Sequence, residues 1–127
     1  MLAPGDYFYL DCGFGNKYGG NSWCDPFNGW WRIYSFEPTD YYTDDSVLGG
    51  ELEGWSELFN DLNLQTRIWS RAAAMSDKLW GPKVDVDLLA VTKRINRFSE
   101  YLNARNIPTT PITGVWCEQF DHCFDKH

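Results

Sequence analysis

The segment from Val47 to Glu57 and the pattern that follows it most strongly limit how this chain can fold. An apolar pair, Val47-Leu48, leads into two glycines and then into three glutamates spaced around one tryptophan. This layout is typical of a strand that carries polar residues to the rim of a binding site. We therefore treat Glu51, Trp55 and Glu57 as the first candidates for function.

A helix is predicted directly after this segment, over residues 63–80. Apolar or small residues recur there at steps of four, three and four, at Ile68, Ala72, Met75 and Leu79. These steps indicate one face of a helix, and Gly81-Pro82 is expected to end it. A strand, a rim loop and a following helix form one β/α unit, and the chemistry of such units lies at the carboxyl end of the strand.

The bulk composition fits one domain and argues against a nucleic-acid partner. The chain has 127 residues and a net charge of −7, whereas a phosphate backbone needs a basic groove. No apolar run is long enough to span a bilayer, so no membrane partner is expected.

Aromatic residues are abundant, with seven Trp, seven Tyr and eight Phe. They indicate either a tryptophan-rich core or a sugar site, where flat rings stack on pyranose faces.

The four cysteines form two close pairs in the sequence, Cys12 with Cys24 and Cys117 with Cys123. Two local disulfides are the favoured interpretation, and they indicate an oxidising compartment. A zinc site is the weaker alternative, because neither pair has CxxC spacing and the two histidines lie at the extreme C-terminus. We expect neither a metal nor a cofactor. Met1 to Gly5 shows no signal-peptide pattern, so we expect a piece of a longer secreted protein.

The remaining segments alternate short ordered elements with loops. Residues 6–10 read as a buried strand, residues 13–29 as a loop that presents Trp23, and residues 30–34 as a short helix. Asp85 or Asp87 is expected to cap a second helix. Its apolar stripe is Leu88, Val91, Ile95, Phe98 and Leu102. An extended tail follows from residue 108 to residue 116, and nothing in the sequence divides the chain into domains.

Three segments carry a resemblance to a known family. They are Tyr9-Leu10-Asp11-Cys12-Gly13-Phe14-Gly15 with Asn21-Ser22-Trp23-Cys24, then residues 47–57, and then Asn63-Leu64 with Arg67-Ile68-Trp69-Ser70-Arg71-Ala72-Ala73-Ala74 to Leu79-Trp80. With these motifs the chain resembles the C-terminal part of the catalytic domain of family 20 β-N-acetylhexosaminidases, especially the chitooligosaccharide-degrading type of insects and other invertebrates. The likeness covers nearly everything from Asp6 onward.

The resemblance implies an α/β fold, the C-terminal portion of a TIM (β/α)8 barrel. Residues 7–11 would be strand seven, residues 47–51 strand eight and residues 63–80 the last barrel helix, followed by a C-terminal helix and a disulfide-closed tail. A whole barrel takes about 250 residues, so two strands cannot close one. Residues 1–127 are therefore expected to form one partial catalytic domain, a C-terminal fragment.

The resemblance also implies a mechanism in which the substrate's 2-acetamido oxygen attacks the anomeric carbon. Such enzymes are exceptions to the two-carboxylate scheme of glycosidases. An Asp-Glu pair supplies the general acid in the family, and no Asp-Glu dipeptide occurs in this sequence. Tyr9 would stabilise the transition state by hydrogen-bonding the acetamido oxygen, Asp11 and Glu57 would hold sugar hydroxyls, Trp55 would line the pocket, and Trp23 would stack on the next sugar. Glu51 would support the turn after strand eight.

Two interpretations of the whole chain stay open. In the first, it is part of a β-N-acetylhexosaminidase that acts on N-acetylhexosamine-containing oligosaccharides. The parent protein would be secreted or lysosomal, and whether it forms a homodimer stays open. In the second, it is an inactive glycan-binding or orphaned remnant, since Leu52-Glu53-Gly54 replaces residues that are small and apolar in the family. The extra charge of Glu53 is expected to raise the pKa of a neighbouring carboxyl or to admit water.

Overall fold

A computed structural model describes residues 1–14, 24–43, 46–82 and 87–113, and within these residues the chain is helical. Its elements are α1 (Gly5–Phe8), α2 (Trp30–Ser35), the 3-10 helix η1 (Pro38–Asp40), α3 (Leu64–Trp80) and α4 (Leu88–Asn103). None of the helices in this part of the chain has both the length and the apolar character needed to cross a bilayer.

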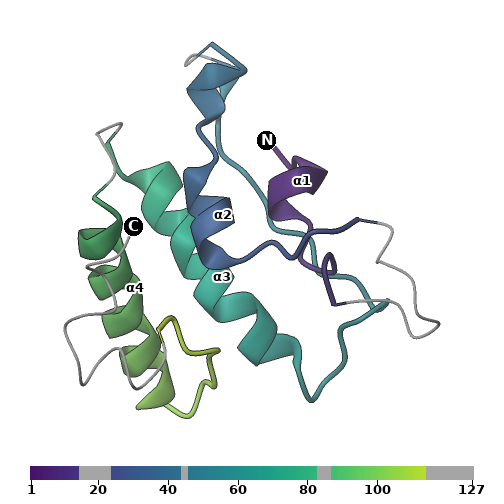
Figure 1. The fold of residues 1–127 in the computed structure, drawn as a ribbon, viewed down its shortest axis with the longest axis vertical. Helices are drawn as coiled ribbons and strands as arrows, with labels where there is room; N and C mark the ends of the chain where they lie inside the picture. Colours follow the sequence, from purple (N-terminus) through teal and green to yellow (C-terminus); the bar gives the residue numbers. More distant parts are fainter. Residues whose placement is uncertain (15–23, 44–45, 83–86, 114–127) are drawn as a thin grey trace.

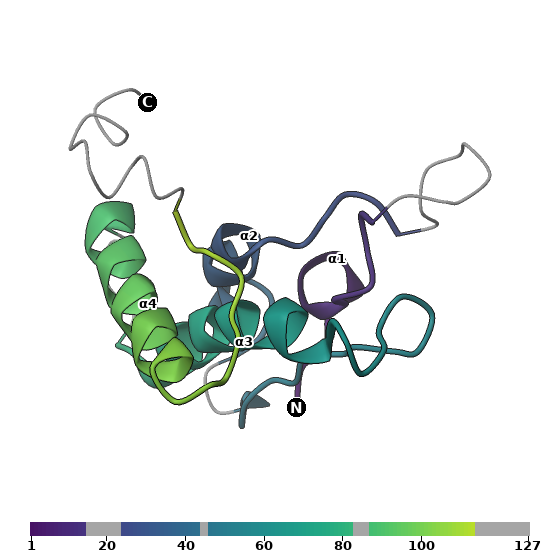
Figure 2. The same cartoon turned by 90° about the horizontal axis from the view of Figure 1, so that it is seen from below.

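Helix α3 lies at the centre of the molecule. It packs against α2 and α4, and α1 contacts α2, so that α4 and α1 lie on opposite sides of α3 (Figures 1 and 2). The segment after α4 turns back over α3, where the Thr110 carbonyl accepts a hydrogen bond of 2.6 Å from the Ser70 hydroxyl. Ile112, two residues further on, is buried in the core. Three parts of the sequence therefore meet on one helix.

The predicted helix over residues 63–80 is confirmed as α3, but its most buried face is not the predicted stripe. Ser70, Arg71 and Ala74 are buried, whereas Ile68 and Met75 are only partly buried against the core. An apolar stripe matches the buried face when a helix lies on the surface of one core. Helix α3 is covered on different sides by α2, α4 and the segment after α4. The residues of α3 that are buried are those that face these neighbours.

The second helix and the short helix are also confirmed. Asp87 caps α4, and its carboxylate accepts hydrogen bonds from the backbone N–H groups of Leu89 and Ala90. Val91 and Ile95 of the predicted stripe are buried, but Phe98 is 43% exposed and lies near Tyr101 with nearly parallel rings. The helix predicted over residues 30–34 corresponds to α2.

The two predicted strands are wrong for the residues that the structure describes. Residues 5–8 form the helical turn α1, and the described part of the chain contains only two isolated parallel bridges, Leu2 with Gly50 and Tyr9 with Glu53. Glu53 donates its backbone N–H to the carbonyl of Phe8, and its carbonyl accepts from Leu10. The two segments thus run side by side in parallel, as neighbouring barrel strands would. A parallel strand is stable when it is paired on both edges and covered on both faces, and here each segment has a single partner.

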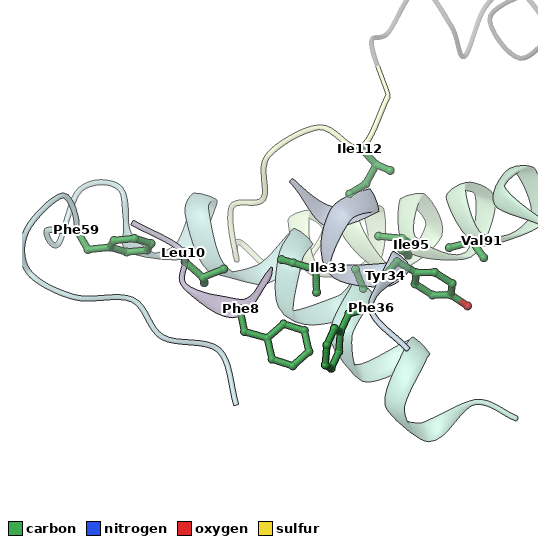
Figure 3. Packing of buried hydrophobic residues seen from close by; sticks show 10 residues of the cluster. Phe8, Leu10, Ile33, Tyr34, Phe36, Phe59, Val91, Ile95 and Ile112 are labelled. Atoms are coloured by element: carbon green, nitrogen blue, oxygen red, sulfur yellow. The ribbon is translucent and has the colours of Figure 1, made fainter. Parts of the chain in front are cut away.

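The hydrophobic core extends from Phe59 and Leu10 at one end to Val91 at the other (Figure 3). At its middle the rings of Phe8 and Phe36 meet edge to face, with centroids 5.2 Å apart. Ile33 of α2 is fully buried beside them. This core fixes the position of residues 8–12 against α2 and α3, and these residues carry the candidate site.

Candidate functional site

Tyr9 and Glu57, two of the residues predicted for the site, are in direct contact. The Tyr9 hydroxyl donates a hydrogen bond of 3.1 Å to Oε2 of Glu57. The parallel bridge between Tyr9 and Glu53 brings the two segments together, although 48 positions separate the residues in the sequence. The structure therefore places a phenol donor and a carboxylate acceptor on one surface.

The pKa of Tyr9 is raised from its ordinary value to about 12. Burial of the phenol is the largest cause, followed by the hydrogen bond to Glu57 and its charge, and then by the charges of Asp11 and Glu53. A phenolate beside three carboxylates is strongly disfavoured, because like charges repel. Tyr9 therefore keeps its proton at any physiological pH and acts only as a neutral hydrogen-bonding group.

Asp11 fixes the loop that carries Trp55 and Glu57. Its side chain is 1% exposed, and its two carboxylate oxygens accept backbone N–H groups, from Trp55 at 2.6 Å and from Leu58 at 3.1 Å. Hydrogen bonds to a buried carboxylate are among the stronger ones in proteins. Both Asp11 oxygens thus bind protein groups, so the predicted contact of Asp11 with a sugar hydroxyl stays a prediction.

The side chain of Trp55 is 55% exposed, and Trp55 lies in the same loop as Glu57. Gly54 lies before it, where a Cβ would approach the ring of Phe59 to 3.3 Å, so the backbone passes close to that ring. Glu51 is exposed and donates its backbone N–H to the Leu2 carbonyl, within the first parallel bridge. Leu52 packs against the core.

The predicted disulfide between Cys12 and Cys24 is present, with the two Cα atoms 5.0 Å apart. It closes the loop that contains Trp23, but Trp23 lies outside the described residues. The predicted pair Cys117 and Cys123 also lies outside them. Within the described residues, no three His, Cys, Asp or Glu side chains are grouped as metal ligands would be.

The hydrogen bond between Tyr9 and Glu57 lies on an exposed surface. Three clefts lie elsewhere, and neither Tyr9 nor Glu57 lines any of them. One lies between α3 and α4, one beside Glu37 and Lys78, and one is lined by Phe14, Phe27 and two arginines of α3. A sugar site encloses most of its ligand, whereas the contact of Tyr9 with Glu57 is exposed and Trp55 is exposed in the same loop as Glu57. The residues therefore supply hydrogen-bonding groups and a ring for one side of a pocket.

Sequence reasoning missed the arginine pair Arg67 and Arg71, four residues apart on α3. Arg71 is 4% exposed and binds the carbonyls of Leu10 and Asn28 at 2.9 and 3.3 Å. It therefore ties α3 to the segment that carries Tyr9 and Asp11. The available signal was two arginines spaced by four among the apolar residues of a helix, where charged residues are rarely buried.

Comparison with known proteins gives a consistent result. Residues 1–83 match the family described as glycosyl hydrolase family 20, catalytic domain. The chain is 34% identical over 128 residues to a chitooligosaccharidolytic beta-N-acetylglucosaminidase of Ostrinia furnacalis, which covers 98% of this chain and 21% of the relative. It is 32% identical over 157 residues to a probable beta-hexosaminidase of Arthroderma benhamiae, covering 100% of this chain and 26% of the relative.

A third relative extends the comparison to a mammal. The beta-hexosaminidase subunit alpha of Rattus norvegicus is 33% identical over 98 residues, covering 73% of this chain and 19% of the relative. The chain thus spans about a quarter or less of the length of the curated relatives that it matches. The match includes Tyr9, Asp11, Trp55 and Glu57, since all four lie within residues 1–83.

Proposed function

Since the chain belongs to the catalytic domain of glycosyl hydrolase family 20, we propose that it contributes one wall of the active site of a β-N-acetylhexosaminidase. The reaction is hydrolysis of terminal, non-reducing N-acetylglucosamine or N-acetylgalactosamine residues from chitooligosaccharides or glycoconjugates. The observation that carries this proposal is the Tyr9 hydroxyl, held 3.1 Å from Glu57, whose loop also carries the exposed side chain of Trp55.

Tyr9 is suited to stabilise the transition state by holding the acetamido oxygen in position for its attack. Its raised pKa, about 12, keeps the phenol protonated. When the 2-acetamido oxygen attacks the anomeric carbon, the acetamido group becomes a positively charged oxazolinium, and a fixed O–H donor to that oxygen holds it in line for the attack. Without substrate, this donor points to Glu57. Substrate binding therefore exchanges the Tyr9–Glu57 hydrogen bond for contacts of each group with the sugar.

Glu57 and Trp55 are proposed to hold the non-reducing sugar. A carboxylate accepts hydrogen bonds from sugar hydroxyls, and an indole ring offers a flat face to the C–H groups of a pyranose. Asp11 keeps both residues in place through its hydrogen bonds to the backbone of the same loop. Trp23 is proposed to stack on the next sugar.

The proton donor must come from residues that this sequence does not supply. No Asp-Glu dipeptide occurs in it, and the curated relatives are about four to five times longer than the matched segment. We infer that a longer parent supplies the Asp-Glu pair and the opposite wall, and that this chain alone does not turn over substrate. A secreted or lysosomal parent is supported by the Cys12–Cys24 disulfide, because such bonds persist in oxidising compartments.

Glycan binding without catalysis is the second candidate function. It is favoured by the absence of an Asp-Glu pair and by the openness of the Tyr9–Glu57 surface. In this case Trp55 and Glu57 would bind N-acetylhexosamine without any bond cleavage. When the Asp-Glu pair and the opposite wall are supplied, the hydrolase function predicts turnover of substrate and the glycan-binding function predicts none.

A chimera tests the proposal. Residues 1–127 replace the aligned segment of the Ostrinia furnacalis relative, and release of 4-methylumbelliferone from its N-acetylglucosaminide is measured for the chimera and for this chain alone. We expect turnover by the chimera only, and a loss of about 100- to 1,000-fold on Tyr9→Phe. Tyr42→Phe, at an exposed tyrosine outside the site, is the matched control.

The other outcomes are equally informative when circular dichroism shows that each protein is folded. A folded chimera that binds chitooligosaccharides without turnover favours the glycan-binding function. Turnover by this chain alone would contradict our inference that the acid is missing. Equal activity of the Tyr9→Phe and Tyr42→Phe chimeras would remove Tyr9 from the mechanism.

A further inference from the structure

The cleft beside Arg67 and Arg71 has features that the hydrolase proposal does not use. Both arginines line it, together with Phe14, Phe27, Trp30, Trp31 and parts of the returning tail, and its volume is about 410 Å³. This volume lies in the range of small-molecule sites. The walls are mostly apolar, so the cleft combines cationic groups with a hydrophobic lining.

Arg71 is an incompletely paired buried cation. Its Nε donates to the Arg67 carbonyl at 2.6 Å and its Nη1 donates to the carbonyls of Leu10 and Asn28, but its Nη2 has no hydrogen-bond partner among the residues that the structure describes. The side chain is 4% exposed. A buried donor without an acceptor carries the full cost of its desolvation, so an acceptor at Nη2 would be strongly favoured.

The charge around Arg71 is also unbalanced. Its pKa is lowered to about 10, mainly by burial and next by the charge of Arg67, while Asp11 opposes both effects. Neither arginine forms an ion pair with any Asp or Glu of the described residues, and both oxygens of Asp11 bind backbone N–H groups. The rings of Phe14 and Phe27 lie 5.7 and 5.2 Å from the Arg71 guanidinium and compensate only in part.

We propose that this cleft binds a carboxylate carried on an apolar, aromatic-sized body. The carboxylate accepts from Nη2 of Arg71 and is attracted by Arg67, whose guanidinium stacks 3.9 Å above the centroid of Phe14. The body lies against Phe27, Trp30 and the 57%-exposed ring of Trp31. The apolar walls favour an organic acid over inorganic phosphate, which would have to shed water from three charged oxygens.

A carboxylate of this kind has two sources, a free acid or a glutamate side chain flanked by aromatic residues. The probes are phenylacetate and the blocked peptide acetyl-Phe-Glu-Phe-amide. Their neutral counterparts are phenylacetamide and the same peptide with Gln. Binding to the full chain is measured by isothermal titration calorimetry and by the rise of the thermal midpoint at constant ionic strength, since a ligand of the folded state raises that midpoint.

We expect saturable binding of at least one acidic probe, at least tenfold tighter than its neutral counterpart and tighter than phosphate. The tighter of the two acids identifies the source. Arg67→Gln should weaken binding about tenfold or more, because it removes one charge without touching the carbonyl contacts of Arg71. Arg94→Gln, which removes an arginine paired with Asp77 outside the cleft, should change the affinity less than twofold.

Arg71→Gln is not the primary variant, because it also removes hydrogen bonds to Leu10 and Asn28. Equal binding of the acids and their amides would show an apolar cleft with no role for the arginines. Equal binding of phosphate would show a general anion site. Absence of saturable binding by a cooperatively melting chain, or an equal effect of Arg67→Gln and Arg94→Gln, would overturn the proposal.

Discussion

At the residue scale, Asp11 combines deep burial with two backbone hydrogen bonds and so fixes the loop of the candidate site. Asp11→Asn keeps the shape of the side chain but replaces one carboxylate oxygen by an NH2 group. That group is a donor, so the N–H group of either Trp55 or Leu58 loses its acceptor. We expect a loss of about 2 kcal/mol in the free energy of unfolding, measured by urea denaturation. Asp61→Asn, at an exposed aspartate, is the control and should be nearly neutral. Equal stability of the two variants would contradict the role of Asp11.

Tyr9 offers a second measurement on the same surface. Ultraviolet titration of the wild type minus Tyr9→Phe should show one tyrosine that ionises near pH 12, and Glu57→Gln should lower that pKa toward 10. The folded-state pKa is above the unfolded value, so this contribution to stability is complete below pH 10 and is lost as the pH rises to 12. An unchanged pKa in Glu57→Gln would show that Glu57 does not contribute to the raised pKa of Tyr9.

At the scale of the elements, the helices were predictable and the strands were not. The apolar steps that predicted α3 and α4, the cap predicted at Asp85 or Asp87 and the end at Gly81 are local signals; both helices, the Asp87 cap and the Gly81 end are confirmed, whereas the predicted buried face of α3 is not. A parallel strand depends on neighbours distant in the sequence, so residues 6–10 form part of a helical turn and one isolated bridge, at Tyr9, instead.

The same distinction applies to the candidate site. The family resemblance indicated Tyr9, and the layout of residues 47–57 indicated Glu57; the structure brings the two into contact. The sequence did not show that Asp11 would be saturated by backbone groups, because that depends on the conformation of the loop at residues 55–58. Arg71 escaped notice for a related reason: its burial results from packing on α3 from several sides.

Helix α4 provides a direct test of which apolar residues support the fold. Ile95 is 2% exposed in the core and Phe98 is 43% exposed, although both belong to the predicted stripe. Ile95→Ala should reduce the free energy of unfolding by about 2 to 5 kcal/mol, because it leaves a cavity, and Phe98→Ala by less than about 1 kcal/mol. Urea denaturation of both variants measures this. If Phe98→Ala reduced the free energy of unfolding by as much as Ile95→Ala, the Phe98 side chain would have to be covered in solution.

At the scale of the whole molecule, a partly buried ion pair connects the segment after α2 to α3. The Lys78 ammonium lies 2.8 Å from Oε2 of Glu37, and the side chains are 13% and 18% exposed. Burial alone would raise the pKa of Glu37, but hydrogen bonds from Lys78 and Thr39 and the charge of Lys78 outweigh it and lower the pKa to about 2. The pair is therefore a source of acid sensitivity for the packing of α2, η1 and α3.

This ion pair predicts a specific pH profile. Because the folded-state pKa of Glu37 is below its ordinary value of 4.5, the stabilisation is complete above pH 4.5 and is lost as the pH falls to 2. The shift corresponds to at most about 3 kcal/mol. Urea denaturation from pH 2 to 7 should show Glu37→Gln less stable than the wild type at neutral pH, with the difference vanishing near pH 2. Glu51→Gln, at an exposed glutamate outside the pair, should show no such convergence. A difference independent of pH would mean that Glu37 acts through packing and not through its charge.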